Sequence, residues 1–337
     1  MLWVSTVWTP ELLTFFLRLA RHKSPARGAT LNVNTAVLST HGLSKQYGSR
    51  PAVRDLDLEV RRGEVFGFLG PNGAGKTTTI RMALGLIRPT AGWVEVLGRD
   101  VQRHRADVLP RVGALVETPA LYPYLSGRSN LRAFAHMLGG VPDARLDEVL
   151  DLVGLADRQR DRVRTYSMGM KQRLGVAVAL LNDPELLILD EPANGLDPAG
   201  IVEMRDLLRQ LVASGKTVFI SSHVLAEVQQ ICDRVAIIDR GELVREATVA
   251  DLVASHGEFV LRMENPEPAL ALLRAQPWGS AARLDDGELV AASPTGRGRD
   301  LVRFLAQSGI WADTIDERQR NLEEIFLSLT APIGAGS

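Results

Sequence analysis

A lysine and a threonine stand directly after a glycine-rich run at residues 70–77. The run follows the apolar stretch 65–69 and precedes an amphipathic one, which predicts a strand, a tight loop and a helix in that order. Glycines let the backbone direct successive N–H groups at one point, and the helix N-terminus adds the positive end of its dipole. The pattern G-x-x-x-x-G-K-[ST] therefore predicts a loop that holds the phosphates of a nucleoside triphosphate.

The residues of this loop have distinct expected roles. Lys76 is expected to place its ammonium on the β- and γ-phosphates, and Thr77 to offer its hydroxyl to Mg²⁺. The other residues expected to contact the nucleotide are Gly70, Pro71, Asn72, Gly73, Ala74, Gly75 and Thr78. The loop indicates what is bound and leaves open what the triphosphate drives.

Two carboxylates end a second apolar run, at residues 186–191. A carboxylate at the end of a buried parallel strand beside such a loop can hold Mg²⁺, so Asp190 is predicted to be the metal partner. Glu191 is expected to point elsewhere and to act as the general base on an attacking water. An acidic strand end that caps the next helix is the structural alternative.

A histidine follows a third apolar run, at residues 217–222. His223 is expected to hydrogen-bond the γ-phosphate, because it lies just past a predicted core strand. A purely structural histidine is the alternative. The residues predicted to act in catalysis are therefore Lys76, Glu191 and His223.

These side chains need a scaffold that brings distant strand ends together. Buried strands are predicted at 65–69, 111–116, 186–190, 217–222 and 234–239, and strands of an antiparallel layer at 38–48, 56–64 and 91–101. Helices are predicted at about 76–87, 129–138, 145–153, 168–182, 198–213 and 223–232. Buried strands that alternate with helices imply an α/β sandwich with a largely parallel sheet.

The chain is expected to divide into four parts. Residues 37–258 form the α/β domain, with a helical subdomain at about 116–182 inserted between two core strands. Residues 259–330, with two helices among four short strands, form a small α+β regulatory or accessory domain, and 331–337 form a tail. Residues 1–36 are an N-terminal extension, either a short amphipathic helix with a basic end or a disordered or non-native leader.

The composition excludes several classes of protein. The formal net charge of the 337 residues is −1, so no overall field favours nucleic acid, which is not expected as a partner. A single cysteine, Cys232, excludes an internal disulfide framework and a cysteine-based zinc site. No apolar run reaches the roughly 18 residues that a membrane span needs, so a cytoplasmic location is expected.

Residues 165–198, TYSMGMKQRLGVAVALLNDPELLILDEPANGLDP, resemble the nucleotide-binding subunit of ABC transporters. Within them, 166–170 resemble a variant of the family's signature motif, whose Ser167, Gly169 and Met170 would contact the nucleotide of a second copy. The resemblance covers about residues 36–250 and implies a P-loop NTPase fold of the ABC ATPase type, with a three-layer core. It also implies ATP with Mg²⁺, and a homodimer with two ATP molecules between its subunits.

Four further assignments follow from the resemblance. Tyr47 lies where the family stacks an aromatic ring on adenine, with a core or surface tyrosine as the alternative. Asp197 matches a loop that crosses the dimer, and His223 matches the switch histidine. Glu117 stands where the family usually has a glutamine that touches Mg²⁺, which leaves its coupling role open. This departure is similar to bacitracin-type and lantibiotic-type immunity exporters, with daunorubicin-type drug exporters as a neighbouring group.

The resemblance implies an ATPase that powers a separate integral membrane permease and lies peripherally on the inner face of the cell membrane. Export of an antibiotic, or of another hydrophobic or peptide compound, is the expected process. One alternative is a soluble ABC ATPase without a permease, although such proteins usually carry two cassettes or a long insertion. The other is a nucleotide-gated interaction protein without catalysis, in which Glu191 or His223 would be expected to be lost.

Overall fold

The computed structural model describes residues 36–117, 119–253, 257–318 and 322–330. These residues form two compact units, which divide after Val249. The sequence places the division at 258, and α9 (Val249–Val253) begins at the observed one. The predicted extension at 1–36, apart from Ala36, and the predicted tail at 331–337 lie outside the described residues.

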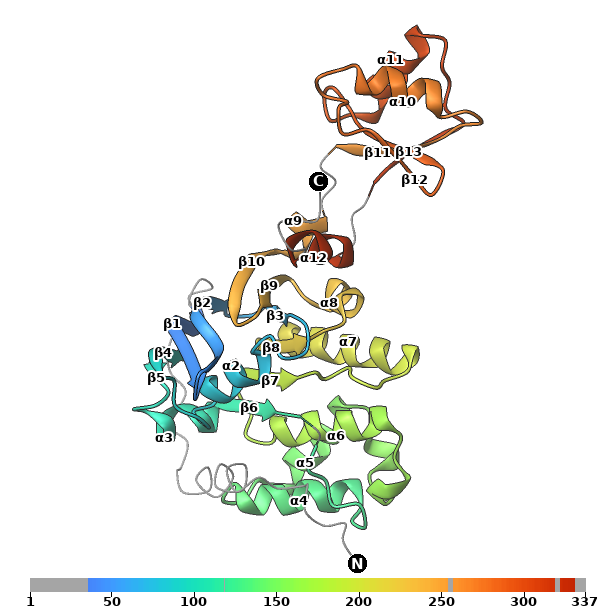
Figure 1. Cartoon of the computed structure of the whole chain (residues 1–337). Coiled ribbons are helices and arrows are strands. Elements are labelled where there is room, and N and C mark those ends of the chain that lie inside the picture. The colour runs from blue at the N-terminus through green and yellow to red at the C-terminus, as the bar shows by residue number, and fades with distance from the viewer. Residues whose placement is uncertain (1–35, 118, 254–256, 319–321, 331–337) are drawn as a thin grey trace, which may run out of the picture. The chain divides into compact units, whose positions relative to one another are not determined.

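Six strands form the main sheet of the first unit, in the order β10-β9-β3-β8-β7-β6 (Figure 1). They are β3 (Val65–Leu69), β6 (Val112–Leu115), β7 (Leu186–Asp190), β8 (Thr217–Ser222), β9 (Arg234–Asp239) and β10 (Glu242–Thr248). All neighbouring strands are parallel except β9 and β10. The five predicted buried strands are confirmed, whereas the antiparallel edge strand β10 was not predicted.

A second sheet of the same unit is antiparallel, with the order β2-β1-β4-β5. Its strands are β1 (Ala36–Tyr47), β2 (Arg50–Arg61), β4 (Ala91–Val96) and β5 (Arg99–Asp100). It occupies the three stretches predicted for an antiparallel layer. Together with the main sheet and its helices, it confirms the predicted α/β fold class.

Helices connect the strands of the main sheet. They are α2 (Lys76–Ala83), α3 (Arg105–Val108), α4 (Gly127–Met137), α5 (Asp143–Leu152), α6 (Met168–Leu180), α7 (Pro198–Ala213) and α8 (Leu225–Ile231), with 3₁₀ turns at Leu109–Arg111, Ala156–Arg158 and Val163–Thr165. Helix α2 ends earlier than predicted, because Gly85 turns the chain with a left-handed φ of 62°. Between β6 and β7 the described regular elements are α-helices and 3₁₀ turns, and the inserted subdomain at about 116–182 stays a prediction.

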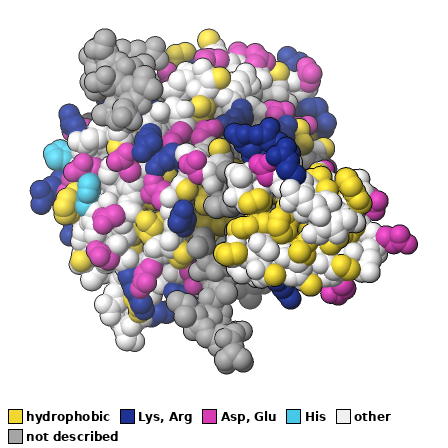
Figure 2. All heavy atoms as spheres, turned by 90° about the horizontal axis from the view of Figure 1, so that it is seen from above, with side chains coloured by type: hydrophobic (Ala, Val, Ile, Leu, Met, Phe, Trp, Pro, Cys, Tyr) yellow, Lys and Arg dark blue, Asp and Glu magenta, His cyan; other side chains and the backbone are white. Residues whose placement is uncertain are grey.

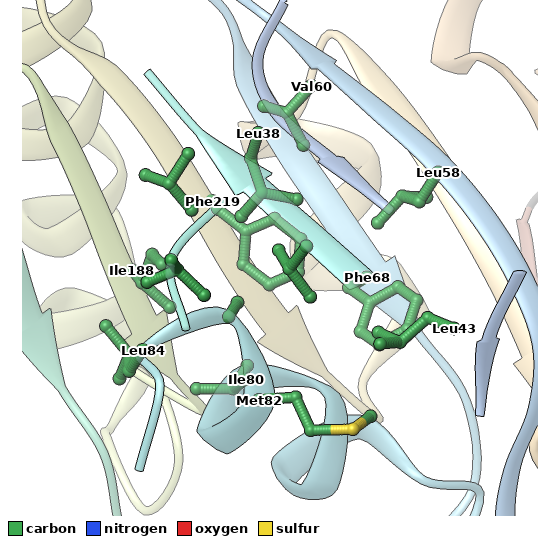
Figure 3. Close-up of a cluster of buried hydrophobic side chains, with 14 of the residues drawn as sticks. Leu38, Leu43, Leu58, Val60, Phe68, Ile80, Met82, Leu84, Ile188 and Phe219 are labelled. Atoms are coloured by element: carbon green, nitrogen blue, oxygen red, sulfur yellow. The ribbon is translucent and has the colours of Figure 1, made fainter. Parts of the chain in front are cut away.

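The core of the first unit lies between the two sheets and takes in the apolar side of α2. In Figure 3, Ile80 and Met82 of this helix lie beside Phe68 and Phe219 of the main sheet. Both α2 side chains are fully buried, and burial of each is worth about 1.5–3 kcal/mol. This packing fixes the helix that begins at the predicted phosphate loop.

The second unit follows the order βαββαβ. Its elements are β11 (Glu258–Arg262), α10 (Glu267–Arg274), β12 (Arg283–Asp285), β13 (Glu288–Ala292), α11 (Gly298–Gln307) and β14 (Thr314–Glu317), followed by α12 (Leu322–Thr330). The sheet is antiparallel, with the order β12-β13-β11-β14, which is the ferredoxin-like arrangement. The two helices and four strands were predicted for this stretch, whereas their pairing order was not.

The surface carries both signs of charge. Figure 2 shows acidic and basic side chains interspersed over much of the face in view, consistent with a formal net charge of −1. Large apolar side chains that are exposed include Tyr124 and Trp311, at 75% and 71%. None of the helices in the described ranges combines the length and apolar character that a bilayer crossing needs.

The contact between α6 and β6 gives a test of this packing. A Cβ atom on Gly113 would lie 2.3 Å from the carbonyl oxygen of Ala179, so Gly113→Ala must push the helix off the sheet. We expect a loss of about 1–3 kcal/mol in the free energy of unfolding, measured by urea denaturation. The matched control is Gly169→Ala in α6, where the new methyl group has only ordinary contacts, 3.7 Å or longer. Equal stability of the two variants would contradict this account.

Candidate nucleotide-binding and catalytic site

The site forms at the carboxyl ends of three neighbouring parallel strands. Leu69 of β3 pairs with Ser222 of β8, and Asp190 of β7 pairs with Ser221. The residues that follow these ends therefore leave the sheet at one edge, which is where open α/β sheets bind their ligands. This register brings together the residues that the sequence marks as chemical: 70–77, 190–191 and His223.

The phosphate loop needs glycine at both of its ends. A Cβ atom on Gly70 would lie 2.4 Å from the carbonyl oxygen of Ile238, and one on Gly75 would lie 2.5 Å from that of Ala52. Gly75 also has a φ of 108°, a conformation that side chains rarely allow. Close beside it, Gly241 donates its N–H to the carbonyl of Ala74 at 3.0 Å. The loop is thus fitted against β2 and the turn after β9.

Lys76 is buried at the first position of α2. Its ammonium donates to the carbonyl oxygens of Gly70, at 2.6 Å, and Pro71, at 3.3 Å. It also lies 3.3 Å from Oε1 of Glu191. The positive charge is therefore held at the loop by two carbonyl oxygens and a carboxylate, with which a phosphate oxygen can compete.

Asp190 is the buried acid of the site. The hydroxyl of Thr77 donates to its Oδ2 at 3.0 Å, and the hydroxyl of Ser221 donates to its Oδ1. Burial raises the pKa of Asp190, and the nearby Glu191 raises it further, whereas both hydrogen bonds and Lys76 oppose the change. A cation bound here would favour the ionised acid.

Thr77 and Asp190 fit a magnesium ion. Both present hard oxygen atoms, and Mg²⁺ typically takes one or two protein oxygens together with phosphates and water. The described residues contain no cluster of three or more histidine, cysteine or acidic side chains able to enclose a metal ion by themselves. The donor set therefore suits an ion that arrives with a nucleotide.

Glu191 points away from Asp190, although the two are adjacent. Its φ of 51° turns the chain at the end of β7, and its N–H donates to the hydroxyl of Ser221 at 3.0 Å. Its Oε2 lies 2.8 Å from Nδ1 of His223. An ionised Glu191 can only accept in this hydrogen bond, so Nδ1 carries the proton and donates it. The two adjacent acids therefore have different side-chain partners, while the separate roles expected of them stay predictions.

Sequence reasoning missed two residues in or near this group of side chains. Ser221 joins Asp190 and Glu191 through its hydroxyl, and only the pairing register of β7 with β8 could have indicated it. Glu227, on the first turn of α8, is a second acid near the pair of Glu191 and His223. Burial raises the pKa of Glu227, His223 lowers it and Glu191 raises it.

Two other predicted residues have partners of their own. Glu117 pairs with Arg81 of α2, and it has a left-handed φ of 63°. Tyr47 ends β1 with about half of its surface exposed, and the ammonium of Lys45 lies 5.2 Å from its ring centroid. The ring of Tyr47 is therefore accessible to solvent. The side chain of Glu117 is already hydrogen-bonded to the guanidinium of Arg81.

The predicted signature residues lie at the start of α6 and bond within it. The hydroxyl of Ser167 caps the helix by accepting the N–H of Met170 at 3.2 Å. Nearby, Asp197 caps α7 by accepting the N–H of Gly200 at 2.9 Å. Ser167 and Asp197 are both exposed. A Cβ on Gly169 would contact Leu196, which places the signature next to the loop before α7.

The cluster joined by direct contacts therefore consists of Lys76, Thr77, Asp190, Glu191 and His223, with Ser221 between them. It offers a fixed cation, oxygen ligands for a metal, and a carboxylate held next to a histidine. Such an arrangement can bind a triphosphate and activate a water for attack on it. Ser167, Gly169, Met170 and Asp197 form a separate group, in which Ser167 and Asp197 are exposed and Gly169 and Met170 are partly buried.

Comparison with known proteins agrees with this chemistry. A sequence model of the family "ABC transporter" matches residues 53–194. The bacitracin transport ATP-binding protein BcrA of Bacillus licheniformis is 40% identical over 306 residues, which cover 90% of this chain and 99% of that protein. The daunorubicin resistance ATP-binding protein DrrA3 of Streptomyces coeruleorubidus is 42% identical over 304 residues, which cover 87% and 95%.

A solved structure of an ATP-binding subunit of an ABC transporter is 31% identical to this chain, with a TM-score of 0.57. The match covers 64% of this chain and 91% of that one. These identities extend over most of the length of the relatives, and the site contains the groups that ATP hydrolysis needs. The chain therefore belongs to the ABC transporter family, as an ATP-binding subunit that hydrolyses ATP.

Proposed function

We propose that two copies of this chain close around two Mg·ATP and power a separate membrane permease. The complex lies on the cytoplasmic face of the membrane and exports an antibiotic, or another hydrophobic or peptide compound. The observation that carries the proposal is the contact cluster at the strand ends, in which Lys76 and His223 each contact Glu191. The names of the relatives BcrA and DrrA3 support the class of compound.

In the proposed reaction each group of the cluster acts at a stated atom. Lys76 binds the β- and γ-phosphate oxygens in place of its present contact with Glu191, which frees Oε1 of that acid. Glu191 then takes a proton from the attacking water, while Nδ1 of His223 holds the other carboxylate oxygen. Thr77 and Asp190 hold Mg²⁺, which neutralises charge on the phosphates.

The separate group at α6 and α7 supports a shared site. Ser167 and the N–H groups around Gly169 stand at a helix N-terminus, which is a ready site for an anion. Within the described part of the chain, the hydroxyl of Ser167 itself caps that N-terminus. Each ATP would therefore lie between the phosphate loop of one copy and Ser167, Gly169, Met170 and Asp197 of the other.

The segment before α4 supports a membrane partner. Tyr122, Tyr124 and Leu125 follow Glu117 closely and are exposed at 39%, 75% and 40%. Glu117, which precedes them in the chain, forms an ion pair with Arg81 of α2. A partner bound to this segment can therefore influence the ATP site. Exposed aromatic side chains in a short loop are typical of a docking surface.

The alternatives have less support. A non-catalytic protein has no need for Glu191 and His223 to be held 2.8 Å apart beside Lys76. A soluble ABC ATPase without a permease would leave the exposed tyrosines before α4 without a role. Membrane association in cells separates this second alternative from the proposal.

Removal of the general base tests the catalytic assignment. Glu191→Gln keeps the shape of the side chain but cannot take a proton, so we expect kcat to fall by about 10²–10⁴-fold. ATP binding should be retained, because Lys76 and Thr77 are unchanged. Steady-state hydrolysis and filter binding of ATP would be measured together, with Glu203→Gln on the exposed side of α7 as control. Hydrolysis at the wild-type rate would show that another group acts as the base.

The shared site is tested at Gly169. The monomer has room for a methyl group there, so Gly169→Ala should fold normally and bind ATP normally. If the helix N-terminus closes on a second copy's phosphates, the methyl group keeps the chains apart. Sedimentation should then show an ATP-induced dimer for Glu191→Gln. When Gly169→Ala is added, the dimer association constant should fall at least tenfold, which corresponds to about 1.4 kcal/mol. An equally stable dimer in both variants would contradict the shared site.

The docking segment is tested with paired substitutions. Tyr124→Ala with Leu125→Ala should leave the ATPase rate of the isolated protein unchanged, because both side chains are exposed. The share of the protein that sediments with membranes of its own cells should fall several-fold. Trp311→Ala, which removes an equally exposed aromatic from the second unit, serves as control. Unchanged sedimentation of the paired variant would remove the segment from the proposed permease contact.

A further inference from the structure

Among the described residues, the Glu117 side chain has Arg81 as its hydrogen-bond and ion-pair partner. The guanidinium of Arg81 donates directly to Oε1 of the acid. Both side chains are partly exposed, at 36% and 54%. A glutamine at 117 would carry no charge to pair with Arg81, so the pair is a specific result of the acid at this position.

Arg81 is placed on α2 by its spacing from Thr77. Residues four apart lie on the same face of a helix, one turn from each other. Ile80 and Met82, on either side of Arg81 in the sequence, are fully buried in the core and fix the helix in place. One face of this rigid helix therefore presents a hydroxyl to Asp190 and, one turn on, a guanidinium to Glu117.

Glu117 approaches the same sheet edge from the other side. It follows β6, which is parallel to β7 and pairs Leu115 with Leu189. Asp190 directly follows Leu189, so the chain passes Glu117 and Asp190 at the carboxyl ends of adjacent strands. The left-handed φ of Glu117 turns its side chain out of the strand direction. The acid thus lies within the same edge as the metal ligands, with Arg81 as its partner.

We infer that Arg81 is a positioning residue that holds Glu117 on α2 and competes with Mg²⁺ for its carboxylate. The inference rests on the proposed function, together with the contact between residue 117 and Mg²⁺ that the family resemblance implies. Without nucleotide, Arg81 keeps the acid paired and limits the negative charge beside Asp190. With Mg·ATP bound, the metal and the guanidinium attract the same carboxylate, so occupancy of the site alters the position of the segment that begins at Glu117.

The sign of the effect follows from charge. Without Arg81, the carboxylate of Glu117 is free to turn to the metal, so Mg²⁺ binds more tightly. Loss of a nearby positive charge also favours Mg²⁺ by itself, and this part does not depend on Glu117. The competition is therefore the difference between the effect of Arg81→Gln with Glu117 present and its effect in Glu117→Gln.

The experiment is a titration of Mg²⁺ on the full chain with a fluorescent, non-hydrolysable ATP analogue, so that hydrolysis is not the readout. Arg81→Gln should lower the half-saturating Mg²⁺ concentration by about twofold to fivefold, the range for a partly exposed ion pair. In the Glu117→Gln background the same change should have at most a small effect. Arg81→Lys keeps the charge and should restore most of the wild-type value.

A matched control is Arg99→Gln, which breaks the exposed pair of Arg99 with Asp107 elsewhere in the same unit. This variant should leave the Mg²⁺ titration unchanged. Equal shifts from Arg81→Gln in both backgrounds would overturn the competition and leave the metal role of Glu117 intact. No change of the titration in Glu117→Gln itself would instead overturn that metal role, and with it this inference, whereas failure to bind the analogue would overturn the proposed function.

Discussion

The hydrogen bond from Thr77 to Asp190 joins the two halves of the site, and the parallel register of the main sheet makes it possible. Thr77 belongs to the helix after β3, whereas Asp190 ends β7, more than a hundred residues later in the chain. The strand between them, β8, contributes Ser221, which bonds to the other oxygen of Asp190. If any one of these strands slipped by a residue, its side chains would change faces and the cluster would separate.

Two features of the site lower the stability of the folded chain. Asp190 is buried, and its raised pKa shows that its charge is unfavourable there before a cation binds. Glu191 adopts a positive φ that favours glycine, a conformation that often costs about 1–3 kcal/mol. Both features serve chemistry, since one acid must face the metal and the other the water. The buried contacts of α2 and the sheets offset these costs.

Much of this arrangement could be predicted from the sequence, because the relevant signals are local. The buried strands are continuous apolar runs, and the glycine-rich loop, Lys76 and Thr77 are adjacent in the chain. Ser221 could not be found in this way, because its role depends on pairing with a strand 31 residues away. Arg81 was missed for the same reason, since its partner Glu117 is 36 residues further on. The pairing order of the second unit was equally inaccessible to local pattern.

One carbonyl group, that of Ala52 in β2, is in close approach with two glycines. A Cβ atom on Gly75 of the phosphate loop would lie 2.5 Å from this oxygen, and one on Gly241, in the turn after β9, would lie 2.8 Å from it. The N–H of Gly241 in turn bonds to Ala74, and its carbonyl accepts the N–H of Arg54. At the carbonyl oxygen of Ala52, the Gly75 end of the loop therefore packs against both sheets. A displacement of the Gly75 end of the loop must therefore move β2 or the turn after β9 with it, whereas a Cβ atom on Gly73 in the middle of the loop would meet no atom outside its chain neighbours within 4 Å.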